Sequence, residues 1–159
     1  MLTRIPRRRP ALALATGLLL APLVVTGASS PAAATPQECE RGANGFVDIP
    51  DTLKGTPAPV APARIIGLTG TLYYGKIGGV TRGWAHLGGE TTWGDSVWMD
   101  WSRDGGRTWI QCGPFEVTSG GQTKTSAAQR TSSDVNWKFR ACVRWGRHIP
   151  PAISCTDWW

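Results

Sequence analysis

Apolar and polar residues alternate along several short segments of this chain. In the segment 95–102, Val97, Met99 and Trp101 share one face, and the residues between them share the other. The segment 137–145 repeats the pattern. Such alternation predicts strands with two distinct faces. Further segments are rich in β-branched, aromatic and glycine residues and also predict strands: 65–74, 79–87, 108–117 and 153–159.

No segment beyond the first 34 residues has the period of an amphipathic helix. Five to seven short strands predict an all-β fold over 65–159, a small disulfide-stapled antiparallel β-sandwich or barrel. The polar stretch 118–133 predicts a loop that includes at most one short strand. Residues 35–64 carry five prolines and little periodic pattern. We therefore expect an extended, polyproline-like N-terminal arm over 35–64.

The first 34 residues have the order of a secretory signal. A start with four arginines precedes an apolar run from Ala11 to Val25, and small residues lead to Ala32-Ala33-Ala34. This triplet fits the A-x-A rule of signal peptidase. A membrane-spanning helix needs about 20 apolar residues, more than this interrupted run offers. We expect a signal peptide over 1–34, cleavage after Ala34 and a secreted, extracellular mature protein without a membrane segment; an uncleaved anchor is the alternative.

This processing changes the net charge. The whole chain carries +6, but four of its 17 basic residues and none of its 11 acidic residues lie in the signal, which leaves +2. A nucleic-acid-binding protein gathers its bases on one face. Here the bases are scattered, so nucleic acid is not an expected partner.

Four cysteines follow the signal: Cys39, Cys112, Cys142 and Cys155. An even number in an exported chain indicates two disulfides, and four cysteines allow three pairings that the sequence does not decide. We favour Cys142–Cys155, which closes a terminal hairpin, and Cys39–Cys112, which fixes the arm to the domain. Metal binding is the rival interpretation, but there is neither a C-x-x-C pair nor a ligand-like histidine spacing. We expect no metal and no cofactor.

The sharpest local motif is Ser102-Arg-Asp-Gly-Gly-Arg-Thr-Trp109. A carboxylate at Asp104 can accept backbone N–H groups in a turn, and two glycines supply positive φ. The motif resembles the Asp-box of sialidases and many secreted β proteins, and the resemblance implies a strand–turn–strand hairpin. In that family the box is structural, and one copy does not make a propeller. The expected turn residues are Ser102, Asp104, Gly105, Gly106, Thr108 and Trp109.

Signs of catalysis are few. His86 and His148 are the only imidazoles, and no G-x-S-x-G motif accompanies them. Two carboxylates could act on a glycoside, and Asp95, Asp100 and Asp104 lie close in sequence, but the turn explains Asp104 better. All cysteines are assigned to disulfides. We expect that the protein is not an enzyme.

All nine tryptophans lie after the signal. Each indole buries on the order of 200 Å² and needs a partner for its N–H, so a small domain does not hide nine of them. We expect about half in the core, Trp98, Trp101, Trp109 and Trp137 among them. Exposed tryptophan and arginine anchor protein interfaces, while flat indole faces also stack on sugar rings. The expected partner-binding residues are Pro57, Pro59, Pro62, Arg64, Arg140, Arg144, Trp158 and Trp159.

Two functions follow from these features. The first is a non-catalytic adaptor that binds other secreted proteins, with the arm as one contact and the β domain as the other. The alternative is a polysaccharide- or cell-wall-binding module in which the arm is a spacer. Deleting 35–64 would separate the two, because only the adaptor would lose a protein partner.

The arginine block, the Asp-box-like hairpin, Cys112-Gly-Pro-Phe115, Phe139-Arg-Ala-Cys142 and Cys155-Thr-Asp-Trp-Trp159 resemble small secreted Trp-rich β proteins of actinobacteria. Size, export and a compact β domain behind an N-terminal arm are also similar to the adaptor subunit of secreted umbrella toxin particles. That resemblance implies an antibacterial toxin complex, in which the adaptor joins a lectin-bearing, protease-like subunit to a large toxin subunit.

Overall fold

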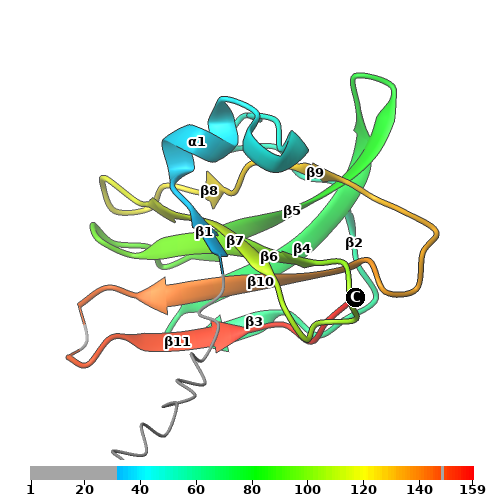
Figure 1. The fold of residues 1–159 in the computed structure, drawn as a ribbon. Coiled ribbons are helices and arrows are strands. Elements are labelled where there is room, and N and C mark those ends of the chain that lie inside the picture. Colours follow the sequence, from blue (N-terminus) through cyan, green and yellow to red (C-terminus); the bar gives the residue numbers. More distant parts are fainter. Residues whose placement is uncertain (1–31, 148) are drawn as a thin grey trace, which may run out of the picture.

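The protein folds as two β-sheets that pack face to face and do not close into a barrel (Figure 1). The computed structural model describes residues 32–147 and 149–159. The all-β sandwich predicted from the alternation is therefore confirmed, and most of the predicted signal peptide lies outside the described residues.

The first sheet has five strands. Its central strand β6 (Ser96–Ser102) pairs antiparallel with β7 and β10, and β11 pairs with β10. The short strand β1 lies beside β7 at the other edge, and it is parallel, unlike the pairs predicted for this fold. The strands, in sheet order, are β1 (Ala32–Ala34), β7 (Ile110–Glu116), β6, β10 (Lys138–Trp145) and β11 (Ala152–Cys155).

The second sheet has six strands built around the long hairpin of β4 (Leu68–Ile77) and β5 (Val80–Gly89). The hairpin turns at Gly78 and Gly79, both with positive φ, as two-residue hairpin turns require. The edge of β4 carries β2 (Thr56–Pro57) and β3 (Ala63–Ile65). The edge of β5 carries β8 (Lys124–Thr125) and β9 (Gln129–Arg130), so the polar stretch 118–133 holds two short strands.

The main core lies between the two sheets. Val97, Met99 and Trp101 of β6 point into it from the five-stranded sheet, as the alternation predicted. Leu72 and Leu87 point into it from the hairpin of the other sheet. The residues of β6 that face away from this core are also buried, and what covers them is part of the candidate site.

The segment 35–64 is not the extended arm that its prolines suggested. Thr35 caps the helix α1 (Pro36–Glu40): its hydroxyl accepts the N–H of Glu38, and the Glu38 carboxylate accepts the N–H of Thr35. A 3₁₀ turn, η1 (Ala43–Gly45), then leads to Phe46, which is buried edge-on against Trp101 in the core. This segment is part of the domain and contributes to its core.

Residues 46–55, called here the strap, cross the outer face of the six-stranded sheet. Ile49 and Leu53 pack with Trp84 in a second, smaller core. The indole N–H of Trp84 donates to the carbonyl of Leu53 at 3.2 Å. Asp51 links the strap to β8. Its carboxylate accepts a hydrogen bond from the backbone N–H of Thr125 and forms an ion pair with Lys124. Periodicity missed this packing because successive strap residues contact different elements, not a single face.

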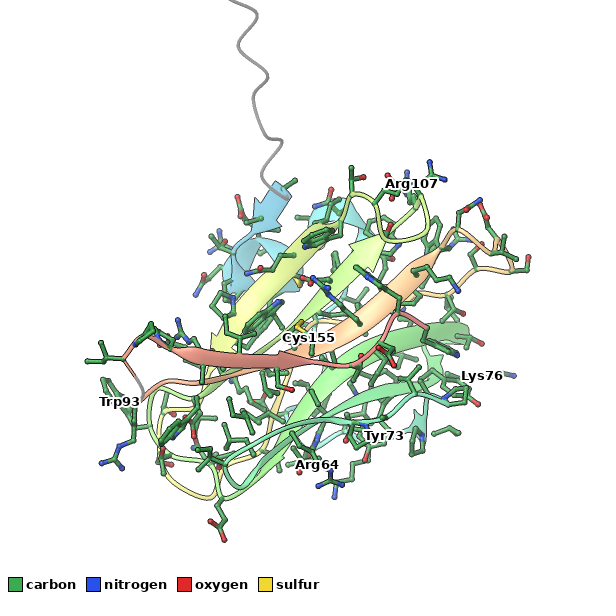
Figure 2. All side chains as sticks on the ribbon, turned by 90° about the horizontal axis from the view of Figure 1, so that it is seen from below. Arg64, Tyr73, Lys76, Trp93, Arg107 and Cys155 are labelled. Carbon is green, nitrogen blue, oxygen red and sulfur yellow. A yellow bond between two sulfur atoms is a disulfide. The ribbon has the colours of Figure 1, made fainter. Side chains whose placement is uncertain are left out.

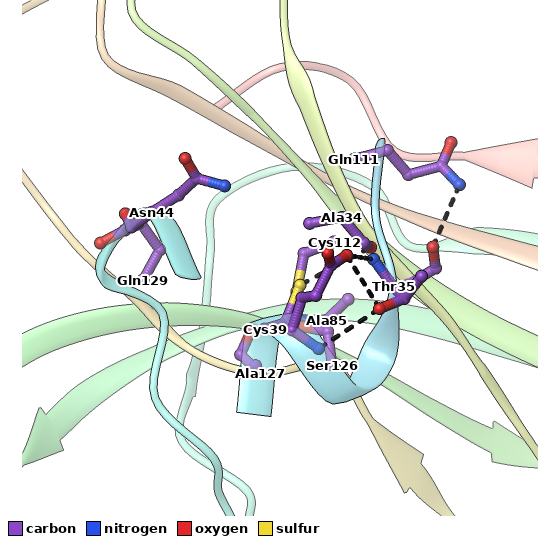
Figure 3. Close-up of a disulfide and its surroundings, with 12 residues drawn as sticks. Ala34, Thr35, Cys39, Asn44, Ala85, Gln111, Cys112, Ser126, Ala127 and Gln129 are labelled. Carbon is purple, nitrogen blue, oxygen red and sulfur yellow. Dashed lines mark hydrogen bonds between the residues drawn. A yellow bond between two sulfur atoms is a disulfide. The ribbon is translucent and has the colours of Figure 1, made fainter. Parts of the chain in front are cut away.

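Both favoured disulfides are present. Cys39 in α1 is bonded to Cys112 in β7, with Cα atoms 6.0 Å apart (Figure 3). Cys142 is bonded to Cys155 across the β10–β11 pair, with Cα atoms 4.0 Å apart. Two disulfides fit folding in an oxidising, extracellular environment. Within the described residues, the structure contains no helix long and apolar enough to cross a membrane.

Candidate functional site

The loop between β6 and β7 is a tight turn built by the Asp-box-like residues. Ser102 Oγ accepts the N–H of Gly106 at 2.8 Å and donates to the Asp104 carboxylate at 2.8 Å. Asp104 in turn accepts the backbone N–H of Thr108 at 2.9 Å and its hydroxyl at 2.7 Å. These hydrogen bonds, first that of the Thr108 N–H, lower the pKa of Asp104 to about 2. The Asp104 carboxylate therefore serves to hold the turn.

The turn supports a cluster on the outer face of the five-stranded sheet. Trp109 follows the turn, and Trp158 from the C-terminal segment packs against Gly106, where a side chain would collide with the indole. The guanidinium of Arg140 lies against both indoles, 4.8 Å from the ring centre of Trp109 and 4.6 Å from that of Trp158. Cation–π contacts of this kind are strongest when both groups are partly desolvated, as here.

Arg140 also closes over a buried carboxylate on β6. Its Nε and a terminal nitrogen lie 2.8 and 2.7 Å from Asp100 Oδ2, and the Asp100 side chain is 1 % exposed. Burial raises the pKa of Asp100, while the hydrogen bond and charge of Arg140 lower it. We call Trp109, Trp158, Arg140 and Asp100 the tryptophan–arginine face.

The three aspartates considered for glycoside chemistry are all held in structural roles. Asp95 is buried and accepts the N–H groups of Thr92 and Gly146. Asp100 lies beneath Arg140, and Asp104 is bound by its turn. A hydrolase would need one such carboxyl free to protonate a leaving group. None of the three is available in this way.

His86 is buried on β5, under the strap. Its ring meets Tyr73 edge-on with centroids 5.5 Å apart, and its Nε2 has no hydrogen-bond partner among the described residues. Burial, followed by the charge of Lys54, lowers its pKa. His148 lies outside the described residues, within which no group of three potential metal ligands was found.

The predicted partner-binding residues lie in three different places. Arg140, Arg144 and Trp158 lie together on the outer face of the five-stranded sheet, where Arg144 pairs with Glu116 at 2.9 Å. Trp159 turns instead towards the six-stranded sheet and stacks on Tyr74 at 5.0 Å. The remaining four lie along the interrupted edge strand beside β4, where Pro57, Pro59 and Arg64 are exposed and Pro62 is half-buried.

Fewer tryptophans are buried than the half of the nine that we expected. Trp84, Trp98 and Trp101 are buried. Trp109 and Trp137, which we expected in the core, are only half-buried. Both lie at the end of the sandwich with the Asp-box-like turn, and each has one face covered, Trp109 by Arg140 and Trp137 by Arg103.

One exposed surface was missed at the sequence level. Trp93, Ile149 and Ile66 are 74, 93 and 67 % exposed, and each lies in a different turn. Hydrogen bonds join these turns at one end of the sandwich: Glu90 N–H donates to Gly67 O, and Gly146 N–H donates to Asp95. Figure 2 shows Trp93 at this end, where β11 begins, and Lys76 and Arg107 towards the opposite end.

We call Trp93, Ile149 and Ile66 the apolar tip. The available signal was weak, because each residue stands alone in a polar, glycine- or proline-containing turn, and only the fold brings the three turns to one end. Comparisons with protein-family models, with curated proteins and with solved structures found no match to this chain.

Proposed function

We propose that this protein is a secreted, non-catalytic adaptor that binds protein partners in an extracellular assembly. The observation that carries the proposal is the apolar tip. Single exposed apolar residues are common on soluble proteins, whereas several large ones gathered at one end are typical of an interaction site. Tryptophan is also among the side chains that most often anchor protein interfaces.

The charge around the tip favours a partner with an acidic rim. Arg147 is exposed two residues before Ile149, and Arg64 is exposed two residues before Ile66. A partner surface with an apolar pocket and an acidic rim would complement this arrangement. Charge at the rim speeds association and selects the partner, while the buried apolar anchors supply most of the affinity.

An adaptor needs a second contact, and the tryptophan–arginine face and the exposed edge around Pro57 and Pro59 offer surfaces away from the tip. Two linked contacts raise the effective concentration of each partner for the other. The assembly implied by the resemblance, an antibacterial particle with a lectin-bearing, protease-like subunit and a large toxin subunit, would use such a bridge.

The rival function is a polysaccharide- or cell-wall-binding module. The half-exposed indoles of Trp109 and Trp158 favour it, since indole faces stack on sugar rings. Their planes are tilted by 60°, however, and the Arg140 guanidinium lies against both rings. A sugar that stacked on the indole surfaces covered by Arg140 would displace the guanidinium from Asp100 and leave a buried charge unpaired. This geometry supports the adaptor over the sugar binder.

Deleting the segment 35–64 no longer separates the two functions, because it would remove Cys39, Phe46 and Ile49 from the core. The test is instead a tip variant carrying Trp93→Ser and Ile149→Ser. The matched control carries Val80→Ser and Val135→Ser, which remove two exposed apolar residues from other parts of the surface. Tagged proteins are recovered from culture medium, and co-purifying proteins are identified by mass spectrometry.

The adaptor predicts a protein partner that is recovered with the wild type and the control and is lost with the tip variant. Retention of the same partner by the tip variant would contradict the proposed contact. Recovery of the protein alone, together with its retention on insoluble chitin, cellulose or peptidoglycan, would favour the sugar binder.

A further inference from the structure

Strand β1 lies at an edge of the five-stranded sheet, where β7 is its one strand partner among the described residues. Ala32, Ala33 and Ala34 pair in parallel with Ile110, Gln111 and Cys112. Ala32 and Ala33 are exposed, but Ala34 is 6 % exposed and belongs to the main core. Figure 3 shows Ala34 beside the Cys39–Cys112 disulfide, and the Cys39 sulfur lies 3.8 Å from the Ala34 carbonyl oxygen.

The same three alanines form the predicted signal-peptidase site. Cleavage after Ala34 would separate β1 from the chain and make Thr35 the first residue of the mature protein. The helix α1 would remain in place, because the Cys39–Cys112 disulfide and the Thr35–Glu38 capping contacts hold it. The backbone N–H and C=O groups of 110–112 that face β1 would then be left without a partner, and such open edges recruit strands.

We propose that this edge of β7 in the mature protein binds an extended segment of another protein as an added parallel strand. The structure defines the peptide that fits. The residue opposite Cys112 must be small, because Ala34 is buried in the main core beside the Cys39–Cys112 disulfide. The two residues before it face solvent and are unrestricted. In this mode of recognition the main chain gives affinity and the pocket gives specificity.

The site is short. Pro114 follows Gly113 on β7 and has no N–H to donate, so the ladder cannot continue far beyond Cys112. Three paired residues make a weak contact on their own, and strand addition here would reinforce a larger interface. The inference depends on cleavage after Ala34 and not on the apolar tip.

The test uses the mature protein as secreted and a synthetic peptide of residues 28–34, Ala-Ser-Ser-Pro-Ala-Ala-Ala. Mass spectrometry first gives the N-terminus. Backbone amide NMR shifts and hydrogen exchange then report binding at 110–112. We expect Thr35 as the first residue, exchange of the open-edge amides in the free protein, and at least tenfold slower exchange in saturating peptide. The free edge of β11 should not respond.

Two controls make the result specific. A peptide with Ala34→Leu should bind at least tenfold more weakly, and the Trp93→Ser protein should bind the original peptide as the wild type does, whether or not the adaptor proposal holds. A mature N-terminus before Ala32 with protected β7 amides would overturn the inference, as would a peptide that leaves residues 110–112 unchanged. Concentration-dependent protection without peptide would assign the edge to a second copy and would also overturn it.

Discussion

The outer faces of the two sheets are covered by different means. On the six-stranded sheet, the strap lays apolar side chains over Trp84, which is 1 % exposed. On the five-stranded sheet, the cover over Asp100 is a single arginine that lies against two indoles. Trp84 is thus covered by chain, and Asp100 by one charged side chain.

This difference separates structural from accessible tryptophans. An indole beneath the strap is fixed by apolar packing and by its N–H bond to Leu53, and it has no route to a ligand. The indoles beside Arg140 keep part of their surface in water because nothing crosses them. The two faces should therefore respond differently to substitution, and the largest effects should lie under the strap.

The strongest test of the comparison is Trp84→Ala. Removing a fully buried tryptophan costs about 3–5 kcal/mol, through lost burial and the cavity left behind. The same change at half-buried Trp158 should cost about 2 kcal/mol on that scale. Urea unfolding of both variants measures the difference. Equal losses at the two positions would show that the strap does not close its face as described.

The second prediction concerns Arg140→Met, which keeps much of the packing against the indoles but removes the charge. Asp100 would be left buried without its ion partner, a change that costs about 3 kcal/mol when water can partly reach the site. Adding Asp100→Asn should recover a large part of this loss. A double-mutant cycle from urea unfolding gives the coupling, and additive losses would exclude a stabilising pair.

The strands could be predicted because burial against the core acts in the same way along each of them. Each central strand has a sheet face towards the core, so burial repeats every second residue, as in Phe139, Ala141 and Val143 of β10. The favoured Cys142–Cys155 bridge rested on the same strands, and the two cysteines do face each other across the terminal pair.

The strap and the candidate surfaces could not be predicted from the periodicity of apolar residues. Phe46 enters the main core, Ile49 enters the second core, and Asp51 binds β8, so no repeat exists to detect. The expected partner-binding residues were chosen by type alone, and the fold joins Arg140 to Trp158 but sends Trp159 to Tyr74. Position relative to a neighbouring element decides these roles, and composition carries no information on it.

A smaller effect should follow from loosening the strap at its polar anchor. Asp51→Ala removes the acceptor for the Thr125 N–H and the ion pair with Lys124. Because the Asp51 side chain is 43 % exposed, water replaces much of what is lost, and we expect a cost of about 1 kcal/mol. Hydrogen exchange within the strap should rise more than in β6. Uniform change throughout the domain would argue against local loosening.

The smallest effect should be a pH dependence near neutrality that arises from His86 on the strap-covered face. Burial lowers the pKa of His86 below its ordinary value of 6.5, the charge of Lys54 acts in the same direction, and Asp51 opposes them. As the pH falls through about 6.5, the unfolded chain therefore takes up a proton before the folded chain does. The free energy of unfolding should be flat above this pH and should decline below it. His86→Phe, which keeps a ring against Tyr73, should remove the slope between about pH 5.5 and 7.5, where carboxylates barely titrate. His148→Asn is the matched control and should leave the slope unchanged. If the slope follows His148 instead, neutral His86 beneath the strap is not its source.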